Sequence, residues 1–596
     1  MAETIAELEK QIDSLPKGCV VVKKIDGRPY FYQQYKNNGK TVSRYLSDEE
    51  ASVMREQIEE RKALQSKLKD MKKNTPYKKS IQFRMNVIKD QPLLDMAETA
   101  SGFQRRDCYP IIRNYVYGRP EDRVCALYGL RRTGKTTLMK QLILDMTDEE
   151  RRQTVYIKAK SSDTIADLNG DIRKGIENGL KYFLIDEITL IEDFIDNAAL
   201  LSDVYAVQGA KFVLSGTDSL GFWFASNEEL YDRCIMVHTT FIPYREHSRL
   251  LGIKSIDDYI RYGGTLKAGE WDFSTSSVSS DEASFADDES ARRYIDTAIS
   301  RNIQHSLSCY DKGRHLRHLK TLYEKDELTG AINRIIEDIN HDFTVEVLTR
   351  DFKSHDLGSA KDLLRREKNP EKRTDILDNT ETAGAVERLR KILEIKNRDE
   401  QTVGIEEIHV KEIREYLKAL DLIDICPIDS LPSAGKREEH VIFIQPGMRF
   451  CQAEALVSSL SDDEEFGKID QHLQLIIKDK IIEDIQGRML EDIVFYETKR
   501  TARKSQDVFK LRFASGEYDM VIYDRNANTC EVYEVKHSTE KSHYQTRHLL
   551  DEEKIRLTEE RFGRITGRHV LYRGETGEDE NGITYRNVEE YLSSIG

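Results

Sequence analysis

The sequence contains no run of about 18 consecutive apolar residues, so it predicts no membrane-spanning helix. Its first ten residues, MAETIAELEK, are acidic and amphipathic, unlike the basic start of a secretory signal. The eight cysteines are scattered and form no C-x-x-C pair, which argues against a zinc site or a disulfide framework. These absences predict a cytoplasmic protein that works without a membrane partner.

The charge balance excludes a uniformly basic nucleic-acid binder, because the net charge of the 596 residues is −15. Residues 1–80 nevertheless hold 17 Lys and Arg against 12 Asp and Glu. Residues 18–46 are predicted to form a small antiparallel sheet, because three strand-like runs are separated by Asp-Gly and Asn-Asn-Gly turns, and residues 48–73 follow as a charged helix. Four aromatic residues are interleaved with the basic ones: Tyr30, Phe31, Tyr32 and Tyr35. Such a sheet can contact a phosphate backbone, but a small fold with a tyrosine core and solvated lysines fits the same pattern.

Residues 105–250 alternate between apolar strand-like runs and helix-like runs. The predicted strands are residues 124–128, 154–159, 182–185, 211–215 and 234–238. Continuous apolar strands interleaved with helices indicate a parallel sheet that is covered on both faces. The predicted fold class for this part is therefore α/β.

A phosphate-binding motif follows the first of these strands. Residues 129–136, GLRRTGKT, match G-x-x-x-x-G-K-[ST] between a strand and a helix. The motif predicts that backbone N–H groups surround the phosphates of ATP, that Lys135 reaches the β- and γ-phosphates, and that Thr136 binds Mg²⁺. The predicted nucleotide-binding residues here are Gly129, Arg131, Arg132, Thr133, Gly134, Lys135, Thr136 and Thr137.

Further candidates for this site follow the later strands. Asp186 and Glu187 end a strand 51 residues after Lys135, where the aspartate is expected to hold Mg²⁺ and the glutamate to orient the attacking water. Thr217 or Asp218 is positioned to sense the γ-phosphate, and a structural turn is the alternative. Arg233 is a candidate arginine finger supplied to a neighbouring subunit, and a surface salt bridge is the alternative.

The middle of the chain, residues 253–465, carries weaker signals. Residues 274–290 are rich in serine and acids and predict a solvated loop. Residues 291–425 are largely helical by their periodicity. A helix, a strand, a polar turn and a second strand then outline a winged helix, with a plain helical lid as the alternative.

The last 130 residues carry four charged residues in a suggestive order. Glu491 lies on a predicted long helix, Asp519 begins a strand, and Glu534 and Lys536 alternate on the next strand. Alternation in a strand directs the last two side chains to one face, so three carboxylates and a lysine can meet at one end of a small sheet. By itself, E-x-K is common on solvated sheet faces. A helix is expected over residues 543–562, with Gln545 as an accessory polar residue.

Several of these motifs together resemble one family. They are YGLRRTGKTTL, LIDE, SGTDSLGFWFA, LYDR, FIPYREHSRLLG and YIRYGG. The chain resembles the prokaryotic, archaeal-type AAA ATPases whose C-terminal half is a restriction-endonuclease-like domain. The resemblance is good over residues 105–270 and 480–540 and loose over 291–460. The chain departs from the family pattern at Gly263-Gly264-Thr265-Leu266, usually Gly-Gly-(Phe)-Pro, and at Arg301-Asn302-Ile303, often Arg-Asp-Ile.

The resemblance implies a PD-(D/E)xK nuclease core at the C-terminus. In that chemistry Asp519 and Glu534 hold Mg²⁺ or Mn²⁺, which polarises the phosphate and lowers the pKa of a bound water. Lys536 positions that water or stabilises negative charge in the transition state. Glu491 matches the acid that the family carries on a helix. Some such domains keep only binding, so cleavage does not follow from the fold.

The sequence therefore predicts an ATPase that governs a metal-dependent nuclease acting on nucleic acid, with DNA as the expected substrate and prokaryotic defence or mobile elements as the setting. One alternative is a nucleotide-gated DNA-binding ATPase whose nuclease-like domain does not cut. Another is a chaperone-like switch with a protein-interaction module. A homo-oligomer is compatible with an AAA-like core. The predicted units are a basic β-module (1–80), the P-loop core (100–252), a helical and winged-helix-like region (253–465) and a nuclease-like domain (466–596).

Overall fold

The computed structural model divides into two compact units, residues 1–82 and residues 83–596. It describes all residues except 1–7, 9–10, 13, 26–27, 38–39, 75–81, 120–121, 192, 218–221, 223–229, 231, 267–270, 273–276, 279–284, 286, 301–302, 304–306, 308–315, 348–404, 433–437, 463–465, 469–470 and 596. Among the helices of the described residues, none combines the length and the apolar character needed to cross a membrane.

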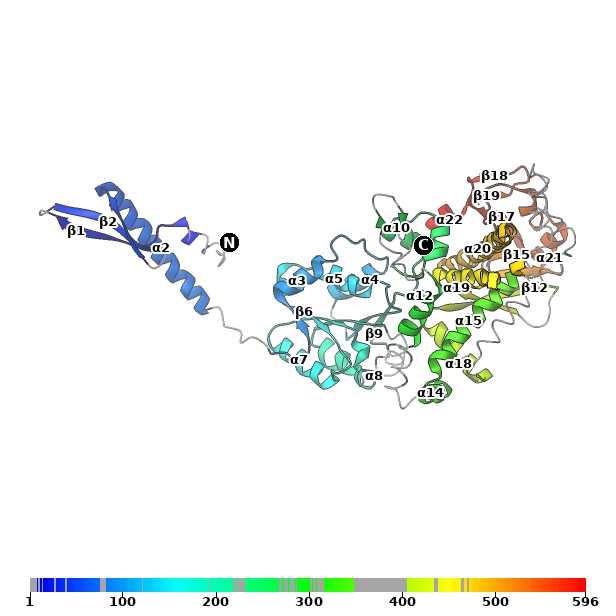
Figure 1. Ribbon diagram of the computed structural model, residues 1–596, viewed down its shortest axis with the longest axis horizontal. Coiled ribbons are helices and arrows are strands. Elements are labelled where there is room, and N and C mark those ends of the chain that lie inside the picture. Colours follow the sequence, from blue (N-terminus) through cyan, green and yellow to red (C-terminus); the bar gives the residue numbers. More distant parts are fainter. Residues whose placement is uncertain are drawn as a thin grey trace. The chain divides into compact units, whose positions relative to one another are not determined.

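The first unit is a three-stranded antiparallel sheet followed by one long helix (Figure 1). The elements are β1 (Cys19–Ile25), β2 (Arg28–Asn37), β3 (Lys40–Leu46) and α2 (Asp48–Asn74). The sheet and the helix predicted from the sequence are both present. The helix starts where Ser47 and Glu50 form a reciprocal cap, since each side chain accepts a hydrogen bond from the other residue's backbone N–H.

The second unit begins with a six-stranded sheet in the order β4-β6-β7-β8-β5-β9. Its strands are β4 (Val87–Ile88), β5 (Val124–Tyr128), β6 (Thr154–Lys158), β7 (Tyr182–Asp186), β8 (Lys211–Gly216) and β9 (Cys234–His238). All pairs except β4 with β6 are parallel. The strand positions and the α/β class predicted for this region are confirmed.

Helices cover both faces of this sheet, as Figure 1 shows. They are α3 (Asp90–Glu98), α4 (Tyr109–Tyr117), α5 (Lys135–Asp145), α6 (Asp148–Arg152), α7 (Ile165–Glu177) and α8 (Phe194–Asn197). Leu138 of α5 packs with Leu127 and Leu184 on one face, whereas Leu168 of α7 packs with Ala126 and Ile185 on the other. Side chains of successive strand residues thus enter opposite cores, which explains why these strands are apolar throughout.

The middle region is mainly helical in its described part. Its helices are α10 (Tyr244–Leu251), α11 (Ile256–Tyr262), α12 (Asp288–Tyr294), α14 (Arg317–Glu324), α15 (Leu328–Glu346), α18 (Glu407–Ala419) and α19 (Pro446–Ser458). The prediction of a solvated loop over 274–290 is wrong at the C-terminal end of that range. There Phe285 is buried, and Asp287 caps α12. Short strands β10 (Trp271–Asp272) and β11 (Ser277–Val278) pair nearby, and most of that loop lies outside the described residues.

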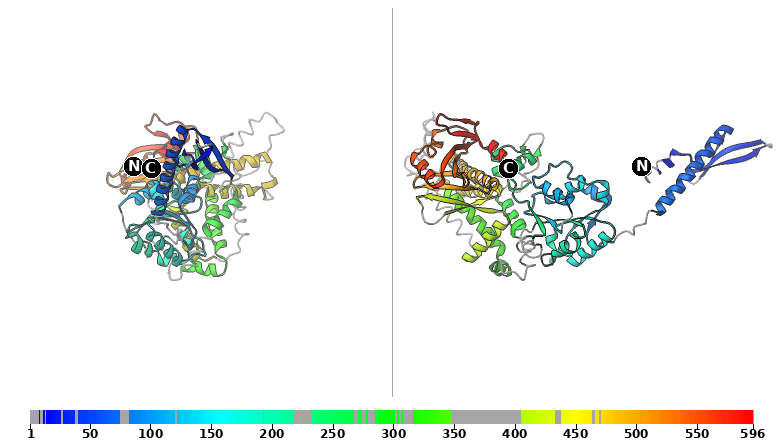
Figure 2. Two further views of the ribbon diagram at one scale, coloured as in Figure 1. Left: turned by 90° about the vertical axis from the view of Figure 1, so that its left-hand side faces the viewer. Right: turned by 180° about the vertical axis from the view of Figure 1, so that it is seen from behind.

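The C-terminal sheet has eight strands in the order β13-β12-β14-β15-β16-β17-β19-β18. Figure 2 shows this part of the chain in yellow-green to red. They are β12 (Ile423–Leu431), β13 (Glu438–Phe443), β14 (Gln506–Phe513), β15 (Glu517–Asp524), β16 (Thr529–Val535), β17 (Arg564–Tyr572), β18 (Gly577–Glu578) and β19 (Thr584–Asn587). The helices are α20 (Gln471–Thr501), α21 (Glu552–Phe562) and α22 (Val588–Ser594).

Two predictions for this half need correction. The strands of the expected winged helix, β12 and β13, belong to the C-terminal sheet, because β12 pairs in parallel with β14. The sheet therefore combines strands from both sides of residue 466. The prediction of a single helix over 543–562 is also wrong, because α21 begins only at Glu552. Asp551 caps it by accepting hydrogen bonds from the N–H groups of Glu553 and Lys554.

Candidate functional site

The phosphate-binding segment joins the end of β5 to the start of α5. Gly129 and Gly134 have φ values of +139° and +89°, which side chains with a Cβ disfavour. A Cβ at Gly129 would lie only 2.7 Å from Thr239 Oγ1, so glycine is required there. Thr136 and Thr137 lie in the first turn of α5, where free N–H groups are available to an anion. The backbone thus has the form that the motif predicts.

Lys135 is buried inside this segment. Its Nζ donates hydrogen bonds to the carbonyls of Gly129 and Leu130, both at 2.8 Å. Burial lowers the pKa of Lys135 to about 8, although the carboxylates of Glu187 and Asp186 oppose this shift. The amine is therefore held at the loop that is expected to surround the phosphates.

Thr136 and Asp186 lie side by side, as expected of a magnesium site. The Thr136 hydroxyl donates to Asp186 Oδ2 at 3.1 Å. The same carboxylate accepts hydrogen bonds from Lys158 at 2.8 Å and from Ser215 and Tyr156. Burial alone would raise the pKa of Asp186, but these hydrogen bonds lower it below its usual value. A hydroxyl and an ionised carboxylate are hard oxygen ligands, so this pair fits Mg²⁺.

Glu187 has a left-handed backbone conformation with φ of +58°. This conformation is unusual for a residue with a side chain, and such strain gathers at functional positions. Its Oε2 accepts hydrogen bonds from the N–H of Thr217 at 3.3 Å and from its hydroxyl at 3.2 Å. The structure thus places Thr217 against Glu187. Asp218, the other candidate sensor, lies outside the described residues.

Sequence reasoning missed a buried arginine behind the phosphate-binding segment. Arg106 forms a two-pronged ion pair with Glu246, with both N···O distances at 2.9 Å. It also donates to the carbonyls of Thr133 at 2.8 Å, Thr239 at 2.6 Å and Phe241 at 2.9 Å. Arg106 therefore fixes the backbone of the segment from behind. Its partner lies 140 residues away, so no local motif could have revealed the pair.

Residues beyond the parallel sheet also contact the segment. The N–H of Leu266 donates to the carbonyl of Arg132 at 2.8 Å, and the Tyr294 hydroxyl donates to the carbonyl of Arg131 at 3.0 Å. The Leu266 side chain lies 3.1 Å from where a Cβ of Gly134 would be. The side chains of Arg131 and Arg132 are exposed. The motif at 263–266, where the chain departs from the family pattern, thus touches the nucleotide-binding loop.

Arg233 is not brought to the phosphate-binding segment of its own chain. Its carbonyl accepts from the N–H of Val124 at 2.9 Å, which places it at the start of β5, whereas the segment follows the end of β5. Its guanidinium is half-exposed and pairs with Asp203. The structure thus shows the salt bridge that was the alternative, and a role toward a neighbouring subunit stays a prediction.

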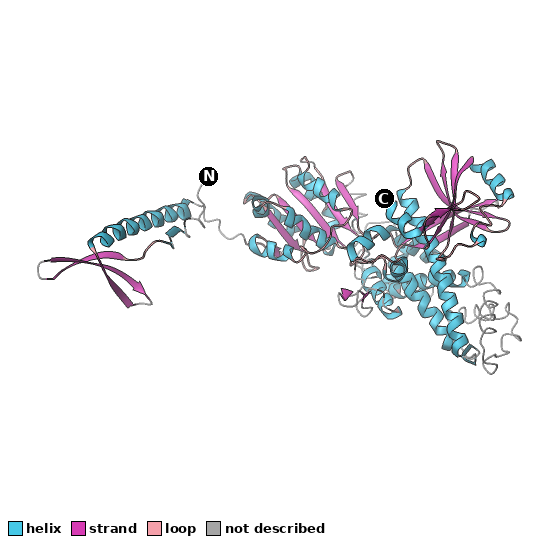
Figure 3. Cartoon of the chain, turned by 90° about the horizontal axis from the view of Figure 1, so that it is seen from above, coloured by secondary structure: helices cyan, strands magenta, loops and turns pink. Residues whose placement is uncertain are grey.

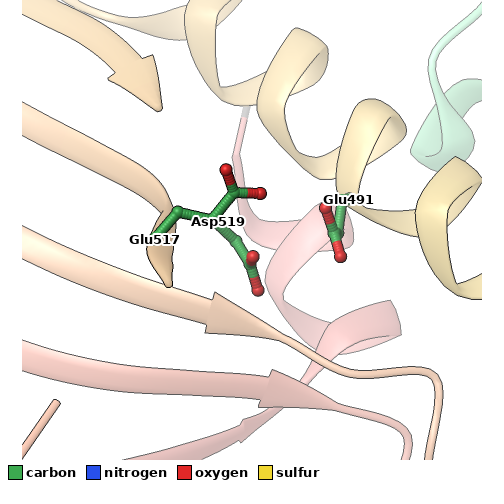
Figure 4. A group of neighbouring side chains, drawn as sticks. All are labelled: Glu491, Glu517 and Asp519. Atoms are coloured by element: carbon green, nitrogen blue, oxygen red, sulfur yellow. The ribbon is translucent and has the colours of Figure 1, made fainter. Parts of the chain in front are cut away.

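The C-terminal candidates form a second cluster. Figure 4 shows Glu491 of α20 facing Glu517 and Asp519 of β15. One ligand atom from each of the three lies within 4.8 Å of the others. Sequence reasoning missed Glu517, which precedes Asp519 by two residues and so lies on the same face of β15.

Glu534 and Lys536 complete this cluster from the end of β16. Lys536 Nζ lies 2.9 Å from Asp519 Oδ2 and 2.8 Å from Glu534 Oε2. Asp519 Oδ2 also accepts from the N–H of Val535 at 2.7 Å. Burial raises the pKa of Glu534 to about 8, and its Oε1 has no hydrogen-bond partner among the described residues. The four residues predicted to converge line one cavity together.

Basic side chains that the sequence did not single out balance these acids. Glu491 Oε2 accepts from Arg488 at 2.6 Å and from the fully buried Lys510 at 2.8 Å. Arg512 Nε lies 3.3 Å from Glu517 Oε2. Two cations already neutralise Glu491, whereas Glu534 contacts one. Asp519 and Glu534 share the single cation Lys536, and their assignment as metal ligands stays a prediction.

Two cavities flank the cluster. One of about 440 Å³ is lined by Glu491, Glu517, Asp519, Glu534 and Lys536. A second, of about 750 Å³, shares Glu491 and Lys536 with the first. Gln545 borders the second cavity but faces its own turn, where Nε2 donates to the carbonyl of Glu540. Glu491 thus borders both cavities, whereas Glu517, Asp519 and Glu534 border the first.

Comparisons with known proteins identify parts of the chain. Residues 121–247 match the profile of an AAA domain, which places this part among the AAA P-loop ATPases, and residues 1–56 match a domain of unknown function (DUF6788). No significant match is found among curated proteins.

Two solved structures show a weak likeness. The Saccharomyces cerevisiae Hsp104:casein complex in its extended conformation is 16% identical at a TM-score of 0.22, and the match covers 30% of this chain. The chain spans about a third (34%) of that Hsp104 chain. The Aeropyrum pernix ORC1 protein in complex with DNA is 11% identical at a TM-score of 0.22, covering 64% of this chain and 98% of that one.

Proposed function

We propose that this chain is an ATPase coupled to a metal-dependent nuclease, with DNA as the expected substrate and prokaryotic defence or mobile elements as the setting. The observation that carries the proposal is the convergence of Asp519, Glu534 and Lys536 on an accessible cavity, in the same compact unit as the AAA domain. The setting rests on the family resemblance alone.

In the ATPase site, Lys135 leaves the carbonyls of the loop and binds the β- and γ-phosphates. Thr136 and Asp186 would hold Mg²⁺, which would neutralise charge on the phosphates. Glu187 orients the attacking water after Thr217 releases it. We expect Lys135→Ala to abolish ATP turnover while the fold remains, because its ammonium serves the phosphates. Wild-type ATP hydrolysis by this variant, measured as phosphate release, would contradict the assignment.

In the nuclease site, Asp519 and Glu534 would hold a divalent cation, which would polarise the phosphate and lower the pKa of a bound water. Lys536 lies between both carboxylates and is oriented by them. From that position its ammonium stabilises the negative charge that develops on the phosphate. The open cavities on both sides give a polynucleotide room to enter and leave.

Cleavage of plasmid and single-stranded DNA with Mg²⁺ or Mn²⁺ tests this half of the proposal. Asp519→Ala and Lys536→Ala should each abolish cleavage and leave ATP hydrolysis intact. Excess Mn²⁺ should partly rescue the first variant, which loses metal affinity, but not the second, which loses transition-state stabilisation. Arg556→Ala, on the exposed face of α21, is the control. Cleavage that survives both substitutions would refute the assignment.

The coupling is carried by α11 and the turn that follows it. Asp257, in the first turn of α11, accepts from His537 Nε2 at 2.7 Å and pairs with Arg573 Nη2 at 2.6 Å. His537 follows Lys536 directly in the chain. Four residues after α11 ends, Leu266 binds the backbone of the nucleotide-binding loop. A shift of that loop on nucleotide binding is therefore transmitted toward Lys536.

The variant Asp257→Asn tests this coupling. It keeps the size of the side chain but removes the charge that holds His537 and Arg573. We expect ATP hydrolysis and metal-dependent cleavage to persist, and the effect of ATP on cleavage to disappear. Asp258→Asn changes the exposed neighbouring carboxylate and is the matched control. An unchanged ATP effect in Asp257→Asn would exclude α11 as the connection.

The neutralisation of Glu491 by two cations favours one second candidate. In a nucleotide-gated DNA-binding protein that does not cut, Arg512, which borders the first cavity, would bind a phosphate group with no need of a metal. That function predicts DNA binding in the presence of a chelator and no cleavage under any metal condition.

A further inference from the structure

The sheet of the N-terminal unit contains no acidic residue in its three strands. The basic residues whose side chains the structure describes are Lys23, Lys24, Arg28 and Arg44. The whole chain carries a net charge of −15, so this concentration of positive charge is local. These charges are divided between the two faces of the sheet, because successive side chains of a strand point to opposite sides, and each face can attract a polyanion.

The helix α2 covers one face of this sheet. Leu46 and Gln33 are buried there, and the Arg55 guanidinium of α2 lies 5.0 Å from the ring centre of Phe31. Phe31 pairs with Leu46 in the register of β2 and β3, so both lie on this face. Figure 3 shows α2 running along one side of the strands. Residues that alternate with this set lie on the opposite face.

The opposite face carries a cluster of tyrosines. Tyr32 pairs with Tyr45 across β2 and β3, and Tyr30 lies two residues before Tyr32 on the same face. The Tyr45 ring centre lies 5.7 Å from that of Tyr32 and 6.2 Å from that of Tyr30, and Tyr45 is 57% exposed. Lys23 on β1 places its Nζ 4.9 Å from the ring centre of Tyr32. Three aromatic rings and an ammonium group therefore form one patch, which we call the tyrosine face.

We propose that the tyrosine face binds single-stranded nucleic acid, with Tyr30, Tyr32 and Tyr45 stacking on bases and Lys23 contacting the backbone. Aromatic rings beside basic groups are the features that bind single strands without sequence preference. A paired duplex hides the flat faces of its bases inside its stack, so the tyrosines favour a single strand. This proposal goes beyond the nuclease and does not depend on it.

The polar residues of this face agree with a nucleic-acid partner. Gln34, Thr41 and Ser43 continue the same face away from the tyrosines, and Gln34 donates to the Ser43 hydroxyl at 3.0 Å. A surface for a protein core or a lipid bilayer would carry aliphatic side chains at these positions. The tyrosine hydroxyls and these amide and hydroxyl groups instead suit sugars and phosphates.

The test uses the full-length chain with Asp519→Ala in the background and a chelator, so that cleavage does not interfere. Fluorescence anisotropy is measured with a labelled oligo(dT) and with a duplex of equal length. Each of Tyr32→Ala and Tyr45→Ala should weaken single-strand binding by roughly tenfold, since one stacked base is lost. Duplex binding should change less.

Lys23→Glu and Lys24→Glu form a matched pair for the face. The two residues are adjacent in β1, so their side chains lie on opposite sides of the sheet and the change in net charge is identical. Lys23→Glu should weaken single-strand binding and reduce its dependence on salt, whereas Lys24→Glu should have a smaller effect. Circular dichroism verifies that each variant folds.

Three outcomes would overturn the proposal. They are unchanged affinity in Tyr45→Ala, equal effects of Lys23→Glu and Lys24→Glu, and a change in oligomeric state without a change in affinity. The last outcome would assign the face to contacts between copies of the chain. A loss of cleavage in the Asp519→Ala parent has no bearing on these measurements, so failure here and failure of the nuclease are distinguishable.

Discussion

The buried pair between Arg106 and Glu246 allows a quantitative prediction. The Glu246 carboxylate accepts three hydrogen bonds, two from Arg106 at 2.9 Å and one from the N–H of Asp107 at 2.7 Å. Both charged side chains are less than a tenth exposed. Burial alone would lower the pKa of Arg106, but the hydrogen bonds and charge of Glu246 raise it. In Glu246→Gln the guanidinium stays buried and loses its counter-charge.

Removing one partner of a buried ion pair costs about 3–5 kcal/mol, because the remaining charge is left uncompensated. The free energy of unfolding should fall by that amount, which shifts the unfolding equilibrium by roughly a hundredfold or more. Nucleotide affinity should fall as well, since Arg106 also holds the carbonyl of Thr133 at the phosphate-binding loop. Urea denaturation and titration with a fluorescent ATP analogue measure the two effects.

The neighbouring residue provides the control. Arg245 pairs with Asp107 at 2.8 Å, but both side chains are more than a third exposed. Solvent screens such a pair, so Arg245→Ala should cost only about 0–1 kcal/mol. If Glu246→Gln is no more destabilising than Arg245→Ala, the buried pair does not support the loop and the reasoning fails.

Three further predictions concern single side chains. Glu187→Gln should bind ATP and retain it in a filter-binding assay, because the magnesium ligand Asp186 remains while the water loses its orienting carboxylate; rapid hydrolysis would assign that role elsewhere. If Arg233 acts on a neighbouring subunit, mixing Arg233→Ala chains with Lys135→Ala chains should restore some ATP hydrolysis. If assembly is verified and no mixing ratio restores hydrolysis, Arg233 does not act on a neighbouring subunit. Burial raises the pKa of Glu497 from 4.5 to about 8, although hydrogen bonds from Tyr244 and Tyr259 oppose the shift. The folded state therefore binds this proton more tightly, so stability should fall as pH rises from about 4.5 to 8, and Glu497→Gln should flatten that part of the stability curve; an unaltered pH profile would refute the assignment.

The ATPase core was predictable because its signals are local. The phosphate-binding segment is contiguous, its strands are continuous apolar runs, and Asp186 ends such a strand. The support of that segment was not predictable. Arg106 and Glu246 meet only after the chain folds, and each looks like a surface residue in its own stretch of sequence.

The C-terminal cluster was predicted in part for a related reason. Glu534 and Lys536 were found because period-two alternation fixes their common face. Lys510 and Glu517 were missed, because alternation does not reveal which face of a strand is buried. Gln545 was expected on a helix, but Ser542 and Gln545 cap a separate short turn. A few hydrogen bonds determine where a cap of this kind forms, and the spacing of apolar residues in the sequence does not predict them.

The parallel pairing of β12 with β14 has a consequence for dissecting the protein. A fragment cut at residue 466 loses β12 and β13, and residues 510–513 of β14 then lose their partners at 428–431. The unpaired backbone of a largely buried strand such as VFKLRF is a template for aggregation. Recombinant nuclease-like fragments should therefore begin before Ile423, and exchange of this region with a related protein requires both segments to move together.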